Sequence, residues 1–291
     1  MGVALRPAAI AVQELTPSLK AALEPRLVSE GGYRPLFHQP WDTCGFNGHE
    51  PYGVGLTTRP PLGPLLTKRY HPYRGSNMGR GLVIGTAEWL LDAAASASAT
   101  PVAAQQGSPP QIVLGSTHLE SFVGVEHPVH AERRAQLVEA GRILADELKR
   151  TPRGACAMLM GDMNWKDDED GDALQALGPG WRDALLDAGS PKGHVATCYS
   201  WRFDRCFYLC PTGSLAPPLH ATDVVLAGKK PGPYLEGKEI QKNNGSTAKC
   251  FPSDHKGPLF TFTTAEADAR AAAASNRQSK ANPFEMAKQR A

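Results

Sequence analysis

A short apolar run that ends in two polar side chains constrains the fold of this chain most. Residues 158–160 are Met-Leu-Met, Gly161 ends the run, and Asp162 and Asn164 follow one residue apart. The run has the length of a buried strand, and alternate residues at a strand end point the same way. We therefore expect Asp162 and Asn164 to project side by side, where a carboxylate and an amide can hold and deprotonate a water. Asp and Asn after Gly also make ordinary turns, so the motif needs partners elsewhere.

The composition indicates one large α/β domain or two small ones. The chain has 291 residues, of which 41% are hydrophobic and 21% are charged, as in an average soluble domain. Its net charge of +2 excludes a global basic footprint for nucleic acid, so any such contact is expected to be a local patch. No apolar run reaches the roughly 18 residues of a membrane span, and no secretory signal is recognisable. The cysteines form no CxxC pair, which favours free thiols over a zinc site built from Cys198, Cys206 and Cys210.

Strand-length apolar runs recur along the chain and are interrupted by two helical patterns. The predicted helices are 17–29 and 129–150, and the predicted strands are 8–12, 33–37, 52–58, 81–91, 111–117, the run around Met158, 202–209, 221–227 and 258–263. Residues 93–110 predict a flexible insertion, 167–172 a solvated acidic loop, and 243–246 another loop. Strand pairs mixed with helices indicate an α/β fold with two sheets and covering helices.

The helix at 129–150 has the clearest amphipathic pattern. Leu137, Gly141, Leu144 and Leu148 fall on one face, which we expect to pack on a sheet. The charged residues assigned to the opposite face are Glu132, Arg133, Arg134, Glu139 and Arg142.

Four further polar motifs stand at the ends of predicted strands. Glu14 lies between a strand end and a helix start, where functional side chains of α/β proteins gather. His118 ends one strand, and Asp204 lies inside a strand-like run, where a carboxylate needs a partner. Asp254 and His255 form a common dipeptide that proves little by itself. Each motif is a weak indication by itself, and only their order along the chain points to a particular fold and function.

Taken in order, these motifs resemble the endonuclease/exonuclease/phosphatase superfamily, which has the DNase I-like fold. The strings STHLES, AER..QL, GDMNW, RFDR and FPSDH are similar to those of the tyrosyl-DNA phosphodiesterases in that superfamily, in matched pieces over 8–262. The resemblance implies an α/β (α+β) fold, a four-layer sandwich of two packed mixed β-sheets flanked by helices. It implies one catalytic domain over 1–264 and a disordered or weakly helical tail over 265–291.

The resemblance also implies a Mg²⁺-dependent phosphodiesterase, with Mn²⁺ as an alternative ion. Glu14 resembles the family's metal-ligand glutamate, and Asp254 would assist the metal through water. Mg²⁺ prefers one or two carboxylates plus water and phosphate oxygens. Asp162 would activate the attacking water, and Asn164 would orient it.

Two histidines complete the implied machinery. His255 and His118 would donate to the phosphate oxygens as charge grows in the transition state, and Asp204 would hold His255 in the right tautomer. The implied substrate is a 5′-phosphotyrosyl bond on DNA, because a phenol with a pKa of about 10 leaves far more easily than an alcohol. The substrate-binding residues implied are Lys166, Tyr52, Trp165 and Ser121.

Two of the departures from the family pattern concern the expected site. The asparagine of the family's first strand has no counterpart ahead of residue 8, so we expect the domain to be incomplete at its start and its catalysis to be weakened. The family's arginine after the GD-x-N motif is Lys166 here, which keeps a charge but loses the two-pronged grip on phosphate.

Two other functions stay open. One is another DNase I-like phosphodiesterase or nuclease, and the other is a catalytically impaired DNA-binding scaffold of the same fold. The expected partner is DNA with a 5′-tyrosyl or peptide adduct and a single-stranded end, but no base-reading element separates DNA from RNA. We expect a monomer that binds no membrane and acts in the nucleus, with the cytoplasm as an alternative.

Overall fold

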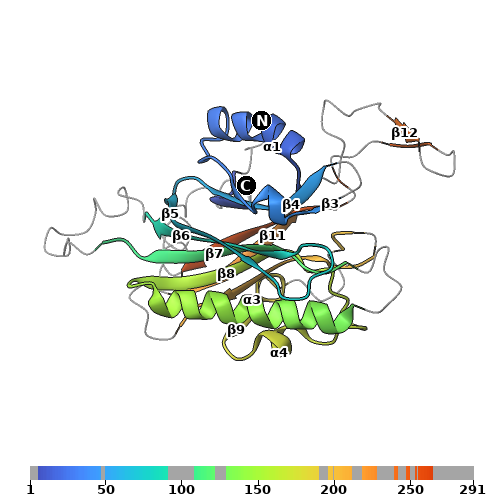
Figure 1. Cartoon of the computed structure of the whole chain (residues 1–291). Coiled ribbons are helices and arrows are strands. Elements are labelled where there is room, and N and C mark those ends of the chain that lie inside the picture. The colour runs from blue at the N-terminus through green and yellow to red at the C-terminus, as the bar shows by residue number, and fades with distance from the viewer. Residues whose placement is uncertain are drawn as a thin grey trace, which may run out of the picture.

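Two β-sheets pack face to face, and helices lie on their outer sides (Figure 1). The structure is a computed structural model. The residues that it describes are 6–46, 50–90, 108–121, 129–189, 196–198, 200–211, 218–227, 239–241, 247–249, 253 and 255–264. The predicted loop at 243–246, most of the predicted insertion and the tail lie outside the described residues.

The larger sheet has six strands in the order β5-β6-β7-β8-β10-β9. Its strands are β5 (Leu62–Pro72), β6 (Gly81–Trp89), β7 (Gln111–His118), β8 (Gly154–Asp162), β10 (Asp204–Leu209) and β9 (Trp181–Asp183). β7 and β8 are parallel, whereas the other pairs are antiparallel, so the sheet is mixed. The central strands are long apolar runs because both faces of this sheet are covered.

The smaller sheet has the order β1-β4-β2, and β3 also pairs with β4. Its strands are β1 (Ala9–Leu15), β4 (Pro51–Thr58), β2 (Phe37–His38) and β3 (Gly45–Phe46). Two further antiparallel pairs are β11 (Leu219–Leu226) with β14 (Pro258–Thr264), and β12 (Glu239–Gln241) with β13 (Thr247–Lys249). The β11–β14 pair packs into the same apolar cluster as the inner faces of the two sheets.

Helices form the outer layers. α1 (Pro17–Ser29) lies outside the smaller sheet, and α3 (His130–Arg150) runs along the outer face of the larger sheet (Figure 1). The short elements are α4 (Ala173–Leu177), α5 (Ala184–Asp187) and the 3-10 turn η1 (Trp41–Thr43). α1 is capped by Thr16, whose side chain accepts a hydrogen bond from the backbone N–H of Leu19 at 3.1 Å.

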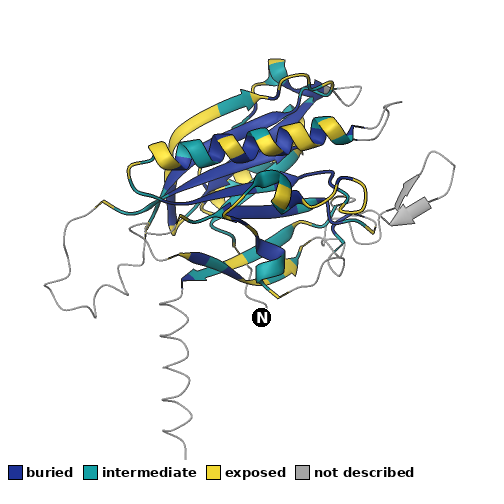
Figure 2. Ribbon diagram, turned by 90° about the horizontal axis from the view of Figure 1, so that it is seen from below, coloured by how far each residue is buried: buried dark blue, intermediate teal, exposed yellow. Residues whose placement is uncertain are grey.

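Buried and exposed residues alternate along α3 (Figure 2). The predicted apolar face is confirmed, since Leu137, Gly141, Leu144 and Leu148 are all buried. Arg133 was assigned to the solvent face, and that prediction is wrong, because its side chain is fully buried. Its guanidinium forms hydrogen bonds of 2.9 and 3.2 Å to the two carboxylate oxygens of Asp170, and this pairing makes its burial tolerable.

The α/β two-sheet architecture predicted for the chain is confirmed, but some local predictions are wrong. The acidic run 167–172 is a solvated loop as predicted except at Asp170, which is buried beneath α3, and Asp172 caps α4. The strand predicted at 33–37 shrinks to the two residues of β2, since Pro35 has no N–H for a ladder. β5 was missed, because it is a largely exposed strand with a polar second half. No helix in the described residues is long and apolar enough to cross a membrane.

Candidate active site

Three strand ends meet in the larger sheet and bring three polar side chains together. β7 is parallel to β8, and their register sets His118 beside Asp162. β10 is antiparallel to β8, and its first residue, Asp204, is opposite Asp162. Segments far apart in the sequence therefore place one imidazole and two carboxylates on adjacent strands.

The carboxylate of Asp162 is buried and lies between two imidazoles. Its Oδ2 atom is 3.4 Å from His118 Nε2 and 3.7 Å from His255 Nδ1. Its Oδ1 atom accepts a hydrogen bond of 2.8 Å from the backbone N–H of Asn164. The distances to the imidazoles exceed those of ordinary N–H···O hydrogen bonds, so Oδ2 keeps the capacity to accept a proton.

The surroundings of Asp162 make it a base suited to neutral pH. Burial, together with the like charge of Asp204, raises the pKa of Asp162 to about 7. The charges of His255 and Arg80 and the hydrogen bond from Asn164 lower the pKa but do not offset those effects. A carboxyl group with such a pKa is about half ionised near pH 7, and its ionised form is a stronger base than an ordinary carboxylate toward a bound water.

The tautomer of His118 is set by Arg80, and its pKa is lowered by burial and by neighbouring charges. The Nη1 atom of Arg80 is 2.8 Å from Nδ1 of His118, and a guanidinium can only donate. Nδ1 is therefore the acceptor, and the proton of the neutral ring sits on Nε2, which faces Asp162. Burial and the charges of Arg80 and His255 hold the pKa of His118 well below its ordinary value of 6.5. His118 thus stays neutral at physiological pH and can donate from Nε2.

His255 is held by a carboxylate and by a neighbouring loop. Its Nδ1 atom is 2.8 Å from Oδ2 of Asp204. Thr197 accepts hydrogen bonds on Oγ1 from the backbone N–H groups of Phe203 and Asp204, each at 3.0 Å. The backbone N–H of Lys256 donates to the Thr197 carbonyl at 2.7 Å. Thr197 therefore links the backbone at Asp204 to the backbone directly after His255.

Two backbone positions in the Gly-Asp-Met-Asn stretch adopt unusual conformations. Gly161 has φ +144°, and a Cβ atom there would lie 1.8 Å from the carbonyl oxygen of Thr117. Asn164 has φ +47°, and its side-chain amide donates to the carbonyl of Leu119 at 3.1 Å. Such backbone strain is found where a site needs a fixed side-chain direction. The hydrogen bond to Leu119 uses the amide nitrogen of Asn164, so the side-chain oxygen remains an acceptor.

The comparisons with known proteins agree with this arrangement. The model of the Endonuclease/Exonuclease/phosphatase family matches residues 3–255. The chain belongs to this family. Membership supports a hydrolase that acts on phosphoester bonds, of the phosphodiesterase or nuclease kind. No curated protein matches the chain.

Solved structures of this fold resemble the chain over most of its length. The structure of humanized D. rerio TDP2 is 23% identical, with a TM-score of 0.59, and the match covers 89% of this chain and 86% of that one. Truncated Caenorhabditis elegans TDP2 is 18% identical, with a TM-score of 0.59 and coverages of 89% and 85%. The human Nocturnin catalytic domain is 17% identical, with a TM-score of 0.56 and coverages of 89% and 81%. At these identities the likeness shows the DNase I-like fold.

The family's metal chemistry makes Glu14 the residue to examine next. Glu14 is exposed on a bulge of β1 and has φ +52°. The side chain of its neighbour Gln13 donates to Ser116 Oγ at 3.4 Å, so this bulge lies close to β7 two residues before His118. Asp254 lies outside the described residues.

The oxygen donors present fit a magnesium ion. In the described part of the chain, no group of three or more His, Cys, Asp or Glu side chains is arranged to hold a metal. Mg²⁺ does not need such a cage, since it binds through one or two carboxylates and completes its shell with water and phosphate oxygens. Glu14, whose carboxylate is exposed, could hold the ion in this way, and its role stays a prediction.

Lys166 and an aromatic pair form one wall near the histidines. The rings of Trp201 and Phe203 stack at 5.7 Å with an interplanar angle of 11°, and Phe203 lies 6.3 Å from the ring of His255. The Nζ atom of Lys166 lies 4.7 Å from the centre of the Trp201 ring and 3.0 Å from Glu169. A cation and stacked rings beside a catalytic cluster suit a phosphate and a base or phenol ring.

Other predicted substrate-binding residues are placed less favourably. Trp165 is wrongly predicted, because its ring is completely buried in the core and its Nε1 donates to the carbonyl of Gly171. Tyr52 is also buried, with Arg80 5.3 Å from its ring centre, so it supports the arginine that contacts His118. Ser121 is buried at the end of a described segment.

Sequence reasoning missed Arg80, Thr197 and Trp201. Arg80 precedes β6 in a Gly-Arg-Gly stretch that gives no chemical signal, because its partner His118 is on another strand. Trp201 directly precedes the Arg-Phe-Asp-Arg motif, so an aromatic residue next to a catalytic motif was the one signal that could have been used.

Proposed function

We propose that this chain is a Mg²⁺-dependent phosphodiesterase that hydrolyses 5′-phosphotyrosyl–DNA bonds. The observation that carries the proposal is the buried Asp162 carboxylate between His118 and His255, with its pKa raised to about 7. The motif resemblance to tyrosyl-DNA phosphodiesterases supports this substrate. So does the similarity to a structure of D. rerio TDP2 complexed with a single-strand DNA product.

Asp162 and Asn164 prepare the nucleophile. Water bound at Oδ2 of Asp162 gives its proton to the carboxylate as the water oxygen attacks phosphorus. The side-chain oxygen of Asn164 accepts a hydrogen bond from the other O–H group of the water and so orients its lone pair toward phosphorus. General-base catalysis of this kind typically contributes about 10²–10⁴-fold in rate.

The two histidines act on the phosphate. His118 carries its proton on Nε2 and donates it toward a phosphate oxygen. Nδ1 of His255 faces Asp204 at 2.8 Å, so its Nε2 is the nitrogen that faces the substrate. Donors that are fixed in place before charge develops stabilise the transition state without reorganisation.

Glu14 would hold Mg²⁺ beside this cluster. The bound ion supplies positive charge to the phosphate oxygens and to the departing phenolate. Because the phenol has a pKa of about 10, the tyrosine side chain departs without a dedicated acid from the protein. Trp201 and Lys166 provide a stacking face and a positive charge for the single-stranded end. We place this activity in the nucleus, where such adducts form, and assign it to a monomer.

The decisive experiment compares three substrates with two variants. Wild-type protein with Mg²⁺ is expected to release tyrosine from a 5′-tyrosyl oligonucleotide faster than it cleaves an abasic duplex or an inositol phosphate. Asp162→Asn should lower this rate by about 10²-fold or more. Asp146→Asn, at a half-buried carboxylate on α3 that pairs with Arg142, is the control and should keep the wild-type rate.

Two results would contradict the proposal. Preference for the abasic duplex or the inositol phosphate would assign the chain to another reaction of the same fold. Binding of single-stranded DNA with no turnover of any substrate would make it a scaffold.

A further inference from the structure

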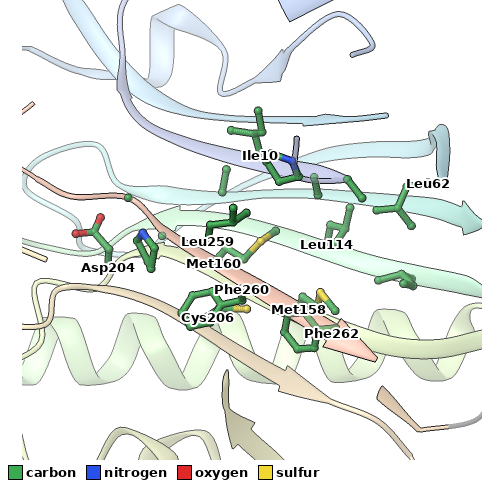
Figure 3. A pocket seen from close by; sticks show the side chains of 18 of the residues that line it. Ile10, Leu62, Leu114, Met158, Met160, Asp204, Cys206, Leu259, Phe260 and Phe262 are labelled. Carbon is green, nitrogen blue, oxygen red and sulfur yellow. The ribbon is translucent and has the colours of Figure 1, made fainter. Parts of the chain in front are cut away.

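Glu120 is a fully buried carboxylate that the proposed mechanism does not use. It comes two residues after His118, the last residue of β7, and lies on the side of the larger sheet that faces α3. The opposite side is mostly apolar, and Figure 3 shows Asp204 at one end of a cavity between β1 and β14 that is lined by side chains such as Met160 and Leu259. A carboxylate is buried only where donors replace its hydration, so the partners of Glu120 indicate what it does.

Four donors surround the Glu120 carboxylate. Its Oε1 atom accepts hydrogen bonds from the backbone N–H groups of Asn77 at 3.1 Å and Met78 at 3.0 Å. Its Oε2 atom accepts from Ser76 Oγ at 2.8 Å and from Gln136 Nε2 at 3.0 Å. The Oε1 atom of Gln136 in turn accepts from the backbone N–H of Glu120 at 2.8 Å. Each carboxylate oxygen thus accepts two hydrogen bonds, as an ionised carboxylate can, and the side chain is held in one position.

These hydrogen bonds attach the turn between β5 and β6 to α3. Ser76, Asn77 and Met78 belong to this turn, whereas Gln136 lies in the second turn of α3. α3 is itself fixed to the larger sheet by its buried apolar face. Glu120 therefore connects a surface turn to one of the most firmly packed elements of the molecule.

The same turn ends at Arg80, which sets the tautomer of His118. The hydroxyl of Ser76 donates to Glu120 and accepts a hydrogen bond of 2.8 Å from the backbone N–H of Arg80. The guanidinium forms few hydrogen bonds of its own. Its Nη1 atom meets His118 at 2.8 Å, its Nη2 atom meets the sulfur of Met78 at 3.7 Å, and its Nε atom has no hydrogen-bond partner within the described part of the chain. The direction of the guanidinium therefore depends on where the turn holds the backbone of Arg80.

We propose that Glu120 is a positioning residue, which holds Arg80 against Nδ1 of His118 and so keeps the proton of that imidazole on Nε2. The connection runs from the carboxylate through the Ser76 hydroxyl and the Arg80 backbone to the guanidinium, with a hydrogen bond of 2.8 Å at each step. This role rests on the proposed function, in which His118 donates from Nε2 to a phosphate oxygen. A neutral ring with its proton on Nδ1 has no donor at that place.

The same network gives a physical role to two sequence strings that contain more than catalytic residues. Glu120 stands in STHLES, and Gln136 stands in AER..QL. Arg133, in the second string, pairs with Asp170, whose Oδ2 atom accepts a hydrogen bond of 2.8 Å from the backbone N–H of Lys166. The first half of α3 therefore anchors two segments, and the one bound by Glu120 carries the arginine of the candidate site.

The test reads the two ring nitrogens of His118 by NMR in the full chain with isotope-labelled histidine, at a pH where the ring is neutral. Wild type should show a protonated Nε2 and an unprotonated Nδ1 that accepts a hydrogen bond. Glu120→Gln replaces one acceptor oxygen by an amide group that faces two donors, so the turn should shift and the Nδ1 signal should move by at least half of the change seen in Arg80→Ala. Ser76→Ala, which removes only the intervening hydroxyl and is the milder change, should move the signal in the same direction.

A control and an activity measurement separate positioning from general destabilisation. Leu148→Ala removes buried methyl groups at the other end of α3, so it should lower stability and leave the His118 signals unchanged. With the 5′-tyrosyl oligonucleotide, Glu120→Gln should lower kcat by about tenfold or more at a nearly constant KM, since displacing a catalytic group by about 1 Å can cost about 10²-fold. Added to Arg80→Ala, Glu120→Gln should change neither the Nδ1 signal nor kcat any further, because both act through one contact.

Three outcomes would overturn the proposal. They are wild-type His118 signals in both Glu120→Gln and Ser76→Ala, an equal change of the signals in Leu148→Ala, and a full additional change when Glu120→Gln is added to Arg80→Ala. The first two would make Glu120 a residue that only stabilises the fold, and the third would give it another route. If wild-type protein turns over no 5′-tyrosyl oligonucleotide, the proposed function fails, and the NMR comparison still decides the role of Glu120 because it uses no substrate.

Discussion

At the scale of single residues, the site is a set of titratable groups held at short range, of which His118 and Asp162 are buried. Asp162 faces Asp204 across the β8–β10 ladder, and both carboxylates approach His255 Nδ1, at 3.7 and 2.8 Å. One imidazole thus lies between two acids, while burial and the charge of Arg80 keep the other imidazole neutral. The electrostatic environment gives each titrating group a different task.

The raised pKa of Asp162 predicts a pH-dependent stability. The folded state binds this proton more tightly than the unfolded state, whose carboxyl titrates near 3.8, because the folded pKa is about 7. The stabilisation is therefore full below pH 4 and is lost as the pH rises toward 7, by an amount on the order of 4 kcal/mol. Urea unfolding of the metal-free protein from pH 4 to 8 should show this loss for wild type and not for Asp162→Asn. Parallel curves for the two proteins would contradict it.

The Arg80–His118 contact predicts a shift that NMR can measure. Arg80→Gln keeps a donor for Nδ1 but removes the positive charge, so the pKa of His118 should rise toward its ordinary value. The imidazole resonances of His118 should titrate at a higher pH than in wild type. Arg69→Gln, which removes an exposed arginine paired with Glu147, should leave that titration unchanged. An unmoved His118 titration in Arg80→Gln would show that burial alone lowers its pKa.

At the scale of secondary-structure elements, the β7–β8 pair is the frame of the site. The parallel register between them sets His118 beside Asp162, and the close approach at Gly161 sets where β8 must turn. A comparison of two glycines separates the cost of a positive φ from the cost of a steric clash. Gly161 combines a positive φ with a steric clash, whereas Gly171 has φ +82° in open space.

Alanine substitutions at these glycines should therefore differ in cost. Gly171→Ala should lower the free energy of unfolding by about 1–2 kcal/mol, the cost of a left-handed alanine. Gly161→Ala adds a contact of 1.8 Å with the Thr117 carbonyl, so it should cost clearly more and disturb the β7–β8 ladder. Urea denaturation measures both values. Equal costs would mean that the ladder moves without penalty.

At the scale of the whole molecule, the two sheets must stay in register for β1 to reach the strand ends of the larger sheet. The contact from Gln13 to Ser116 is the described link between the β1 bulge and β7. A metal held by Glu14 would lie on this bulge, and its binding to the folded chain would stabilise the chain against unfolding.

Binding of Mg²⁺ at Glu14 predicts a rise in the melting temperature. Mg²⁺ at 100 times its dissociation constant should raise the free energy of unfolding by about 2.7 kcal/mol. Glu14→Gln should remove most of the corresponding rise in melting temperature. Glu30→Gln, at an exposed glutamate that ends α1, is the control and should melt like wild type with and without Mg²⁺. If Glu14→Gln responds fully to Mg²⁺, the ion binds elsewhere.

The sequence alone determined where strands end and which polar side chains stand there. His118 and Asp162 follow from a local pattern, because an apolar run of strand length and a polar residue at its end are both properties of neighbouring residues. Asp204 was found as a carboxylate inside a strand-like run. The amphipathic face of α3 followed for the same reason. The α/β class with two sheets and covering helices was predicted from the order of these patterns.

Only the tertiary structure decided which ends are neighbours and which side chains are buried. No local pattern indicates that Arg80 meets His118, that Asp170 pairs with Arg133 beneath α3, or that Trp165 packs in the core. Nor does one indicate that β1 and β14 border an open gap. Strand pairing and burial join residues distant in the chain, and their energies depend on the packing of whole sheets, which no short stretch of sequence contains.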